Sequence, residues 1–209
     1  MAEANVLEKY AGLTPEKRVD YICKNYSRFT GIIESYTQGL VYMIEEEQDF
    51  NRREDRGDLG VRVQGGGFHS DRTANQAIRN VALRDAIIAC DFSDGVLDDT
   101  DHDEEFMRDA AVLRQMRRDF ELFNSQMQQL KENDLLLIQS FLLKEKDLTA
   151  IADERGIQYE SAYQRVRRIK KEIKANVIAF TSVRYSKVQG VKEWPMMQAQ
   201  CISWTSFVW

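Results

Sequence analysis

The sequence predicts an all-α protein, and three observations lead to this prediction. The 209 residues include only two prolines, whereas residues that favour helices, such as Glu, Lys, Arg, Gln and Leu, are abundant. Two long segments carry apolar residues at alternating spacings of three and four, which is the periodicity of one helix face. Near the C-terminus, two shorter segments with helical periodicity are separated by Gly156. We therefore expect long heptad-patterned N-terminal helices that form a bundle or coiled coil, followed by a C-terminal helix-turn-helix.

The first long helix has a clear start signal. Thr14 can cap a helix, and Pro15 suits the first helical position. A heptad-spaced apolar seam follows: Val19, Ile22, Tyr26, Phe29, Ile33, Tyr36, Leu40 and Met43. Glu47 breaks the seam and Phe50 resumes it, before a charged run and Gly57. The pattern predicts one continuous helix from Thr14 to about residue 56.

A glycine-rich segment, residues 57–70, is predicted to be a mobile loop that could carry a short β-hairpin arm. Five glycines lie between Gly57 and Gly67. Ser70 or Asp71 would then cap a helix that runs to about Cys90. Its predicted inward residues are Ile78, Val81, Ala82 and Ile88.

An acidic loop, residues 91–105, is predicted to follow. Ten of the residues 85–109 are acidic and one is basic. A calcium-binding EF-hand counted from Asp99 would need Gly and Glu at its sixth and twelfth positions, which hold Glu104 and Ala110. We interpret the segment as a solvated loop that caps the next helix, without a metal site. A weak site for a hard cation remains open at Asp99, Asp101 and Asp103.

The second long helix carries another heptad-spaced seam: Phe106, Leu113, Met116, Phe120, Phe123, Met127 and Leu130. Two such helices can bury their seams only against each other or against a second copy of the protein. The aromatic content suits a bundle core better than a two-stranded zipper. Residues 1–131 are thus predicted to form a helical oligomerisation region, whose seams are core rather than a ligand site.

Residues 132–180 are predicted to be a DNA-binding domain. Gly156 lies where the first of two short helices must stop, a position that commonly needs a left-handed backbone. The apolar residues are Leu148, Ile151 and Ala152 before the turn, and Ala162, Val166, Ile169 and Ile173 after it. Two short helices joined by a glycine turn are typical of a helix-turn-helix, which places its second helix in the major groove of DNA.

The second helix of this pair carries the candidate DNA-binding residues. They are Gln158, Tyr159, Ser161, Tyr163, Gln164, Arg165, Arg167, Arg168 and Lys171. Arg and Gln can bond bidentately to base edges, and Lys and Arg neutralise phosphates. From Gly156 to Lys192, nine residues are basic and two acidic, although the chain has a formal charge of −5. Such a local basic helix indicates DNA binding. Two alternatives explain the same pattern: an ordinary solvated helix, or a helix that binds an acidic protein partner. A further possibility is that the loop 91–105 competes with DNA for this helix.

This stretch resembles the helix-turn-helix of sigma-factor region 4 and its relatives. The matching residues are Ile151-Ala152, Gly156-Ile157, Ala162, Val166 and the run from Arg165 to Arg168. Gln158 departs from the pattern, because such motifs often have a capping Ser there. Since Gln is a poorer N-cap, the helix start could shift toward Ser161.

Residues 60–79 are similar to a segment of the phage late-gene transcription regulators called the ArpU and RinA families. Ser70-Asp71, Thr73-Ala74-Asn75 and Ala77-Ile78 match, whereas Arg72 replaces a Pro. The two resemblances together imply a small bacteriophage activator that binds double-stranded DNA upstream of phage structural genes.

Other features limit the remaining classes of function. Cys23, Cys90 and Cys201 are too few and too widely spaced for a disulfide framework or a zinc site, which favours a reducing cytosol. We see no signal peptide and no apolar run of membrane-spanning length. His69 and His102 form no recognisable catalytic pattern. We therefore expect neither an enzyme nor a cofactor. The apolar tail, residues 181–209, is expected to be packed or bound to a partner.

The leading hypothesis is a sequence-specific DNA-binding transcription regulator, sigma-like and of the phage late-gene type. It would act as a homodimer in the cytoplasm of a bacterial host cell, with contact to RNA polymerase left open. One alternative is a small terminase-type subunit for DNA packaging, and another is an interaction protein whose basic helix binds an acidic partner. A dimer would favour the regulator, and a ring of about eight or more copies would favour packaging. The DNA target sequence and the choice between activator and repressor remain open.

Overall fold

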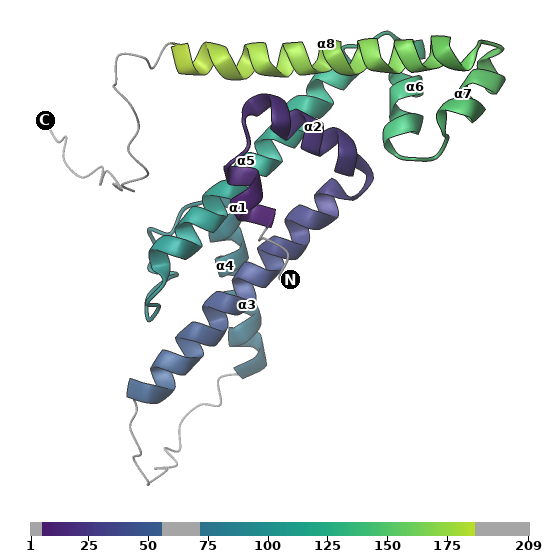
Figure 1. The fold of residues 1–209 in the computed structure, drawn as a ribbon. Helices are drawn as coiled ribbons and strands as arrows, with labels where there is room; N and C mark the ends of the chain where they lie inside the picture. Colours follow the sequence, from purple (N-terminus) through teal and green to yellow (C-terminus); the bar gives the residue numbers. More distant parts are fainter. Residues whose placement is uncertain (1–5, 56–71, 187–209) are drawn as a thin grey trace, which may run out of the picture.

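The computed structural model describes residues 6–55 and 72–186, and all regular elements in these two ranges are helices (Figure 1). The predicted all-α class is thereby confirmed. The elements are α1 (Val6–Ala11), α2 (Pro15–Asn25), a 3₁₀ turn (Tyr26–Arg28), α3 (Phe29–Asp55), α4 (Arg72–Ala89), α5 (Asp103–Gln128), α6 (Glu132–Leu142), α7 (Leu148–Arg155) and α8 (Tyr159–Ser186). The predicted glycine-rich loop, its Ser70 or Asp71 cap, and the tail from residue 187 lie outside the described residues.

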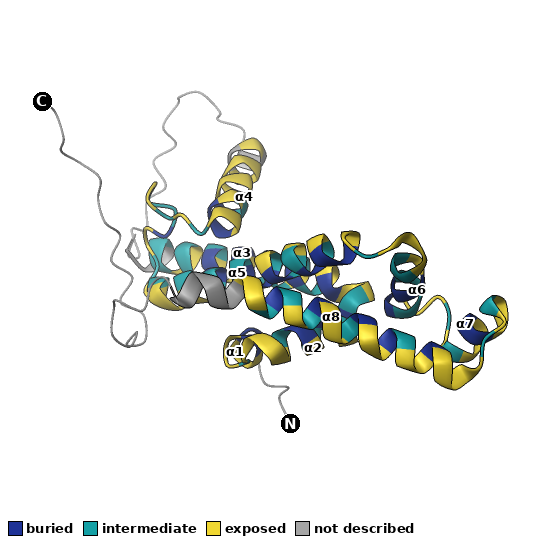
Figure 2. Cartoon of the chain, turned by 90° about the horizontal axis from the view of Figure 1, so that it is seen from above, coloured by how far each residue is buried: buried dark blue, intermediate teal, exposed yellow. Residues whose placement is uncertain are grey.

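The helices form a bundle crossed at one end by a long helix. α3 and α5 lie side by side along the bundle, with α4 on one face and α1 and α2 on the opposite face (Figure 2). α8 crosses the end of the bundle, packs on α2 and α5, and carries α6 and α7 near its own N-terminus (Figure 1). α8 also extends to Ser186, past the predicted boundary at residue 180.

The first predicted helix starts as expected but is not continuous. Thr14 caps α2, and its Oγ1 accepts a hydrogen bond from the Lys17 N–H at 3.4 Å. The prediction of one helix to residue 56 is wrong, because the 3₁₀ turn separates α2 from α3. Buried Asn25 explains the break: its Nδ2 donates to the Tyr21 carbonyl at 2.9 Å and its Oδ1 accepts from Arg28. Such side-chain bonds compete with helical backbone bonds.

The first seam is only partly buried. Val19, Ile22, Phe29, Ile33 and Leu40 are in the core. Met43 and Phe50, in contrast, are 56% and 65% exposed. Val41 and Ile44 take the core positions that the heptad spacing gave to Met43. An α-helix has about 3.6 residues per turn rather than 3.5, so a strict heptad drifts around its surface.

The second seam forms the centre of the bundle. Phe106, Leu113, Met116, Phe123 and Met127 are buried, and Phe120 and Leu130 are partly buried. α5 packs against α3 of the same chain. The residues predicted as core in this helix are therefore core.

The predicted inward face of α4 is wrong. Ile78 and Val81 are 66% and 60% exposed, and Ala82 and Ile88 are exposed as well. Leu83, Ala86 and Ile87 are buried instead. Polar bonds to α3 accompany this rotation: Arg84 pairs with Glu34 at 2.6 Å, and Gln76 donates to Glu45 at 2.9 Å. Two apolar stripes compete in this alanine-rich helix, and the hydrophobic pattern alone does not identify the buried one.

The short helix α1 was not predicted. Its Tyr10 is fully buried and donates from its hydroxyl to Asp119 Oδ2 of α5 at 2.8 Å. Asp119 also accepts a hydrogen bond from Gln115 at 2.6 Å. Burial raises the pKa of the Asp119 carboxyl above its usual range, although these hydrogen bonds and Arg18 oppose the shift. α1 is therefore fixed by one buried polar contact and by apolar burial.

The acidic segment between α4 and α5 is an ordered loop that α3 holds through hydrogen bonds. Gln48 Nε2 donates to the carbonyls of Val96 and Asp98 at 2.8 and 2.9 Å. Glu47 accepts from the backbone N–H of His102 at 3.0 Å. In the described part of the chain, no three His, Cys, Asp or Glu side chains gather as a metal site would require. Asp99, Asp101 and Asp103 thus do not converge. None of the described helices has the length and apolar character needed to cross a membrane.

Candidate nucleic-acid interface

The turn between α7 and α8 is fixed at both of its ends. Asp147 Oδ1 accepts a hydrogen bond from the Ala150 N–H at 2.8 Å and so caps α7. Gly156 ends α7 with φ +61°, and the next N–H, of Ile157, bonds the Ala152 carbonyl at 3.0 Å. No atom lies within 4 Å of the position that a Cβ of Gly156 would occupy. The backbone angle, not space, therefore requires glycine, and the predicted left-handed turn is confirmed.

α8 begins directly after this turn. Its first residue is Tyr159, and the Ala162 N–H bonds the Gln158 carbonyl at 3.1 Å. The expected shift of the helix start toward Ser161 is wrong. Glu160 in the first turn adds a negative charge that interacts favourably with the helix dipole, and the turn after Gly156 already sets the direction of the chain.

One face of α8 is buried along most of the helix. The buried residues are Ala162, Val166, Ile169, Ile173 and Val177. The first of them face α6 and α7, and the later ones reach the bundle, where α8 packs on α2 and α5. Seen from above, α2 lies on one flank of α8, whereas α5, α6 and α7 lie on the other (Figure 2). The opposite face of its first half is left open.

Eight of the nine candidate residues are exposed. These are Gln158, Tyr159, Ser161, Tyr163, Gln164, Arg167, Arg168 and Lys171. Ser161, Gln164, Arg168 and Lys171 follow one another at spacings of three and four, so they share one stripe. Arg167 lies beside this stripe on the side opposite the buried residues. Among the described residues, neither Arg167 nor Lys171 forms an ion pair.

Arg165 is the exception among the nine candidates. Its Nε donates to Asp134 Oδ1 of α6 at 2.6 Å, and its side chain is only 33% exposed. Its guanidinium thus belongs to the contact between α8 and α6 rather than to the open face.

Other basic residues of α8 also serve packing. Lys170 Nζ lies 4.5 Å from the centre of the Phe141 ring of α6, a cation–π contact. Lys174 Nζ lies 2.7 Å from Asp20 Oδ2 of α2. Three cations therefore hold α8 to its neighbours, whereas Arg167, Arg168 and Lys171 remain on the open face.

Sequence reasoning missed Asp134. This residue lies in the first turn of α6, where acidic residues are common because of the helix dipole. Its partner Arg165 is 31 residues away in sequence, and no local spacing predicts such a pair.

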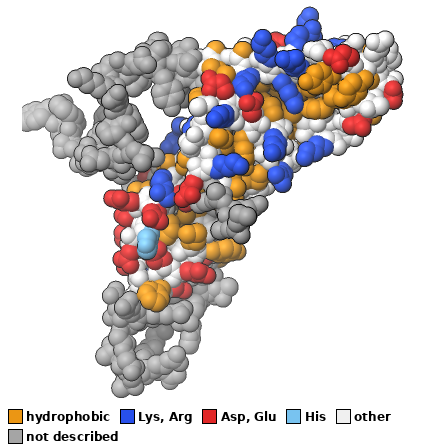
Figure 3. Space-filling view, viewed as in Figure 1, with side chains coloured by type: hydrophobic (Ala, Val, Ile, Leu, Met, Phe, Trp, Pro, Cys, Tyr) orange, Lys and Arg blue, Asp and Glu red, His pale blue; other side chains and the backbone are white. Residues whose placement is uncertain are grey.

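Opposite charges gather at different places on the molecule. In the face shown in Figure 3, Lys and Arg lie along α8, whereas Asp and Glu cluster at the far end of the bundle around the loop between α4 and α5. Within one chain the acidic loop therefore does not cover the open face of α8. This arrangement argues against competition between the loop and DNA in a single copy.

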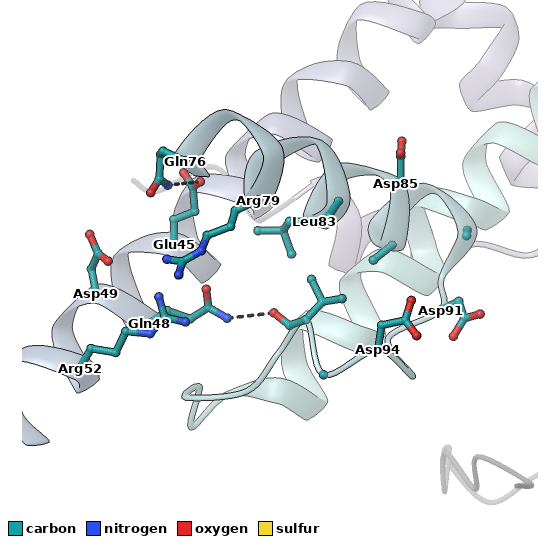
Figure 4. A pocket seen from close by; sticks show the side chains of 15 residues that line it. Glu45, Gln48, Asp49, Arg52, Gln76, Arg79, Leu83, Asp85, Asp91 and Asp94 are labelled. Carbon is teal, nitrogen blue, oxygen red and sulfur yellow. Dashed lines mark hydrogen bonds between the residues drawn. The ribbon is translucent and has the colours of Figure 1, made fainter. Parts of the chain in front are cut away.

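A separate cleft of about 540 Å³ lies between α3, α4 and the residues that follow α4 (Figure 4). Leu83 and Val96 contribute apolar surface to it. The charged residues around it are Glu45, Asp49, Arg52, Arg79, Asp85, Asp91 and Asp94. None of the candidate DNA-binding residues lines this cleft.

Comparison with protein-family models, with curated proteins and with solved structures finds no match to this chain.

Proposed function

We propose that this protein is a sequence-specific DNA-binding regulator of transcription that binds double-stranded DNA through the open face of the first half of α8. The observation that carries the proposal is the exposed stripe of Ser161, Gln164, Arg168 and Lys171, beside Arg167. It lies on a helix that follows α7 through a left-handed glycine turn. This is the arrangement in which a helix-turn-helix presents its second helix to the major groove.

The chemistry of the stripe fits a base-reading face. Gln can bond adenine and Arg can bond guanine through two hydrogen bonds each. Lys171 and Arg167 would neutralise phosphates, and the hydroxyls of Tyr159 and Tyr163 are suitable phosphate donors. From Tyr159 to Lys171 the helix rises about 18 Å, enough to follow the groove across several base pairs.

Access also supports the proposal. In the single chain the side chains of Gln164, Arg168 and Lys171 are exposed, so they are accessible to a DNA duplex.

We further propose that the protein binds DNA as a homodimer. A helix-turn-helix dimer reads two half-sites about one helical turn apart. Met43 and Phe50 of the first seam are exposed in the single chain, and a second copy would cover them. Activation of phage late genes is the specific role that the sequence resemblance suggests.

Selection from random DNA, followed by gel-shift titration at two salt concentrations, tests the proposal. We expect an enriched motif and an affinity that falls steeply with salt. Arg118, an exposed arginine of α5, provides a matched control: Arg118→Ala should bind like wild type, and Arg168→Ala should not. Wild-type protein without salt-sensitive DNA affinity would overturn the proposal. A mass of about eight or more copies in light scattering would favour a ring-forming packaging subunit instead.

A further inference from the structure

The two carboxylate oxygens of Asp134 face two different arginines of α8. Its Oδ1 accepts a hydrogen bond from Arg165 Nε at 2.6 Å. Its Oδ2 lies 3.8 Å from a terminal nitrogen of Arg168, one helical turn further along. α6 thus places a negative charge at the edge of the stripe that carries Arg168.

The two arginines differ in how firmly they are held. Arg165 is 33% exposed and makes the short contact, so it alone satisfies one oxygen of Asp134 and fixes α6 to α8. Arg168 is 67% exposed and only loosely paired. Arg168 can therefore leave Asp134 without breaking the contact between the helices, whereas Arg165 cannot.

We propose that Asp134 sets the DNA affinity of α8 by competing with DNA for Arg168; this inference rests on the proposed function. In free protein the guanidinium of Arg168 is drawn toward Asp134. On binding it exchanges this carboxylate for a phosphate or a guanine edge, while Arg165 stays on Asp134 and keeps α6 in place. Asp134 is thus a positioning residue, which acts through Arg168 and does not touch DNA itself.

Asp134→Asn is the decisive variant. Asn has the same shape and keeps an oxygen that accepts from Arg165 Nε, but it removes the charge that holds Arg168. Glu132→Gln is the matched control, because Glu132 lies in the same first turn of α6, is exposed, and forms no ion pair with any described residue. The control removes one charge from the same turn without affecting either arginine.

The probe is a random-sequence DNA duplex about three helical turns long, with binding followed by fluorescence anisotropy at two salt concentrations. We expect Asp134→Asn to bind about two- to fivefold more tightly than Glu132→Gln, the range that the loss of one exposed ion pair gives. In an Arg168→Ala background this difference should disappear, because a double-mutant cycle isolates the pair.

The outcomes separate the two proposals. If wild type binds DNA and the two variants bind equally, the role of Asp134 is overturned and the proposed function stands. A difference that persists in Arg168→Ala also overturns it. Wild type without DNA affinity overturns both. Thermal melts check the fold, and Asp134→Ser is the second variant if Asp134→Asn melts early. If neither variant folds, Asp134 has a structural role and the inference fails.

Discussion

The two halves of α8 share one buried face but differ on the outer one. In the first half, Gln164, Arg167, Arg168 and Lys171 are exposed. In the second half, the corresponding surface carries Ala175 and Ala179, which are exposed too. A helix of this protein therefore does not need charge on its outer face in order to fold. Under the proposed function, the cations of the first half serve the DNA contact, and the second half lacks them.

Within α8, the largest effect should come from the buried face, where both halves should behave alike. Ile169→Ala and Ile173→Ala each empty a fully packed site and should lower the free energy of unfolding by about 2–5 kcal/mol. Chemical denaturation measures this change, with Ala175→Ser as an exposed control on the same helix. If one of the two variants lowered the free energy of unfolding by less than about 0.5 kcal/mol, the half of α8 that contains it would not be packed as described.

On the outer face the halves should differ. Arg168→Ala should weaken DNA binding by about 1–3 kcal/mol at one base position if the guanidinium reads a base edge. Lys171→Ala should weaken binding evenly across sequences and reduce the salt slope by about one unit. Ala175→Ser in the second half should leave both quantities unchanged. Gel shifts at two salt concentrations check these results, and equal losses for all three variants would contradict the comparison.

A third test concerns the seam of α3. Ile33→Asp and Leu40→Asp would each bury a charge and should unfold the bundle. Met43→Asp and Phe50→Asp change exposed positions, so each should shift stability by about 0.5 kcal/mol or less while halving the mass measured by light scattering. A dimer unaffected by Met43→Asp and Phe50→Asp would exclude this part of α3 from the interface.

The smallest effect concerns pH. The hydrogen bond and charge of Glu47 raise the pKa of His102, whose Nδ1 lies 3.0 Å from Glu47 Oε1. This contact contributes stability that is fully present below the ordinary His pKa and is lost as the pH rises through the raised value. Burial raises the pKa of Glu47, but hydrogen bonds from Asp101 and His102 outweigh it and lower the pKa overall, so its contribution is lost in acid. The melting temperature of wild-type protein should fall as the pH rises through the raised His102 pKa, and that of His102→Gln should not. If His102→Gln kept the pH profile of wild type, the prediction would be contradicted.

The sequence predicted those features that depend on neighbouring residues. Thr14 and Pro15 start α2, Gly156 ends α7, and the stripe from Ala162 to Ile173 is buried. Each follows from a cap, a backbone angle or a periodicity within a few residues. For the candidate site, the same periodicity identified the exposed residues of α8.

Features that depend on distant residues could not be predicted in this way. Asn25 interrupts the first helix through its own side-chain bonds, and the packing of α4 on α3 and α5 buries Leu83 and Ile87 rather than Ile78. Arg165 belongs to the contact with Asp134 because the fold brings them together. A count of charges along a sequence therefore overstates the number of cations available to a partner.

α8 is a single helix of 28 residues, about 42 Å long, and it contains no break between the turn at Gly156 and its packing on the bundle. An unbroken helix does not bend or twist freely between its two halves. If DNA fixes the orientation of the first half of α8, the orientation of the bundle relative to the DNA is fixed as well. Two copies joined through their bundles would then accept only one separation of half-sites, and inserting half a turn of DNA between the half-sites should abolish their joint binding.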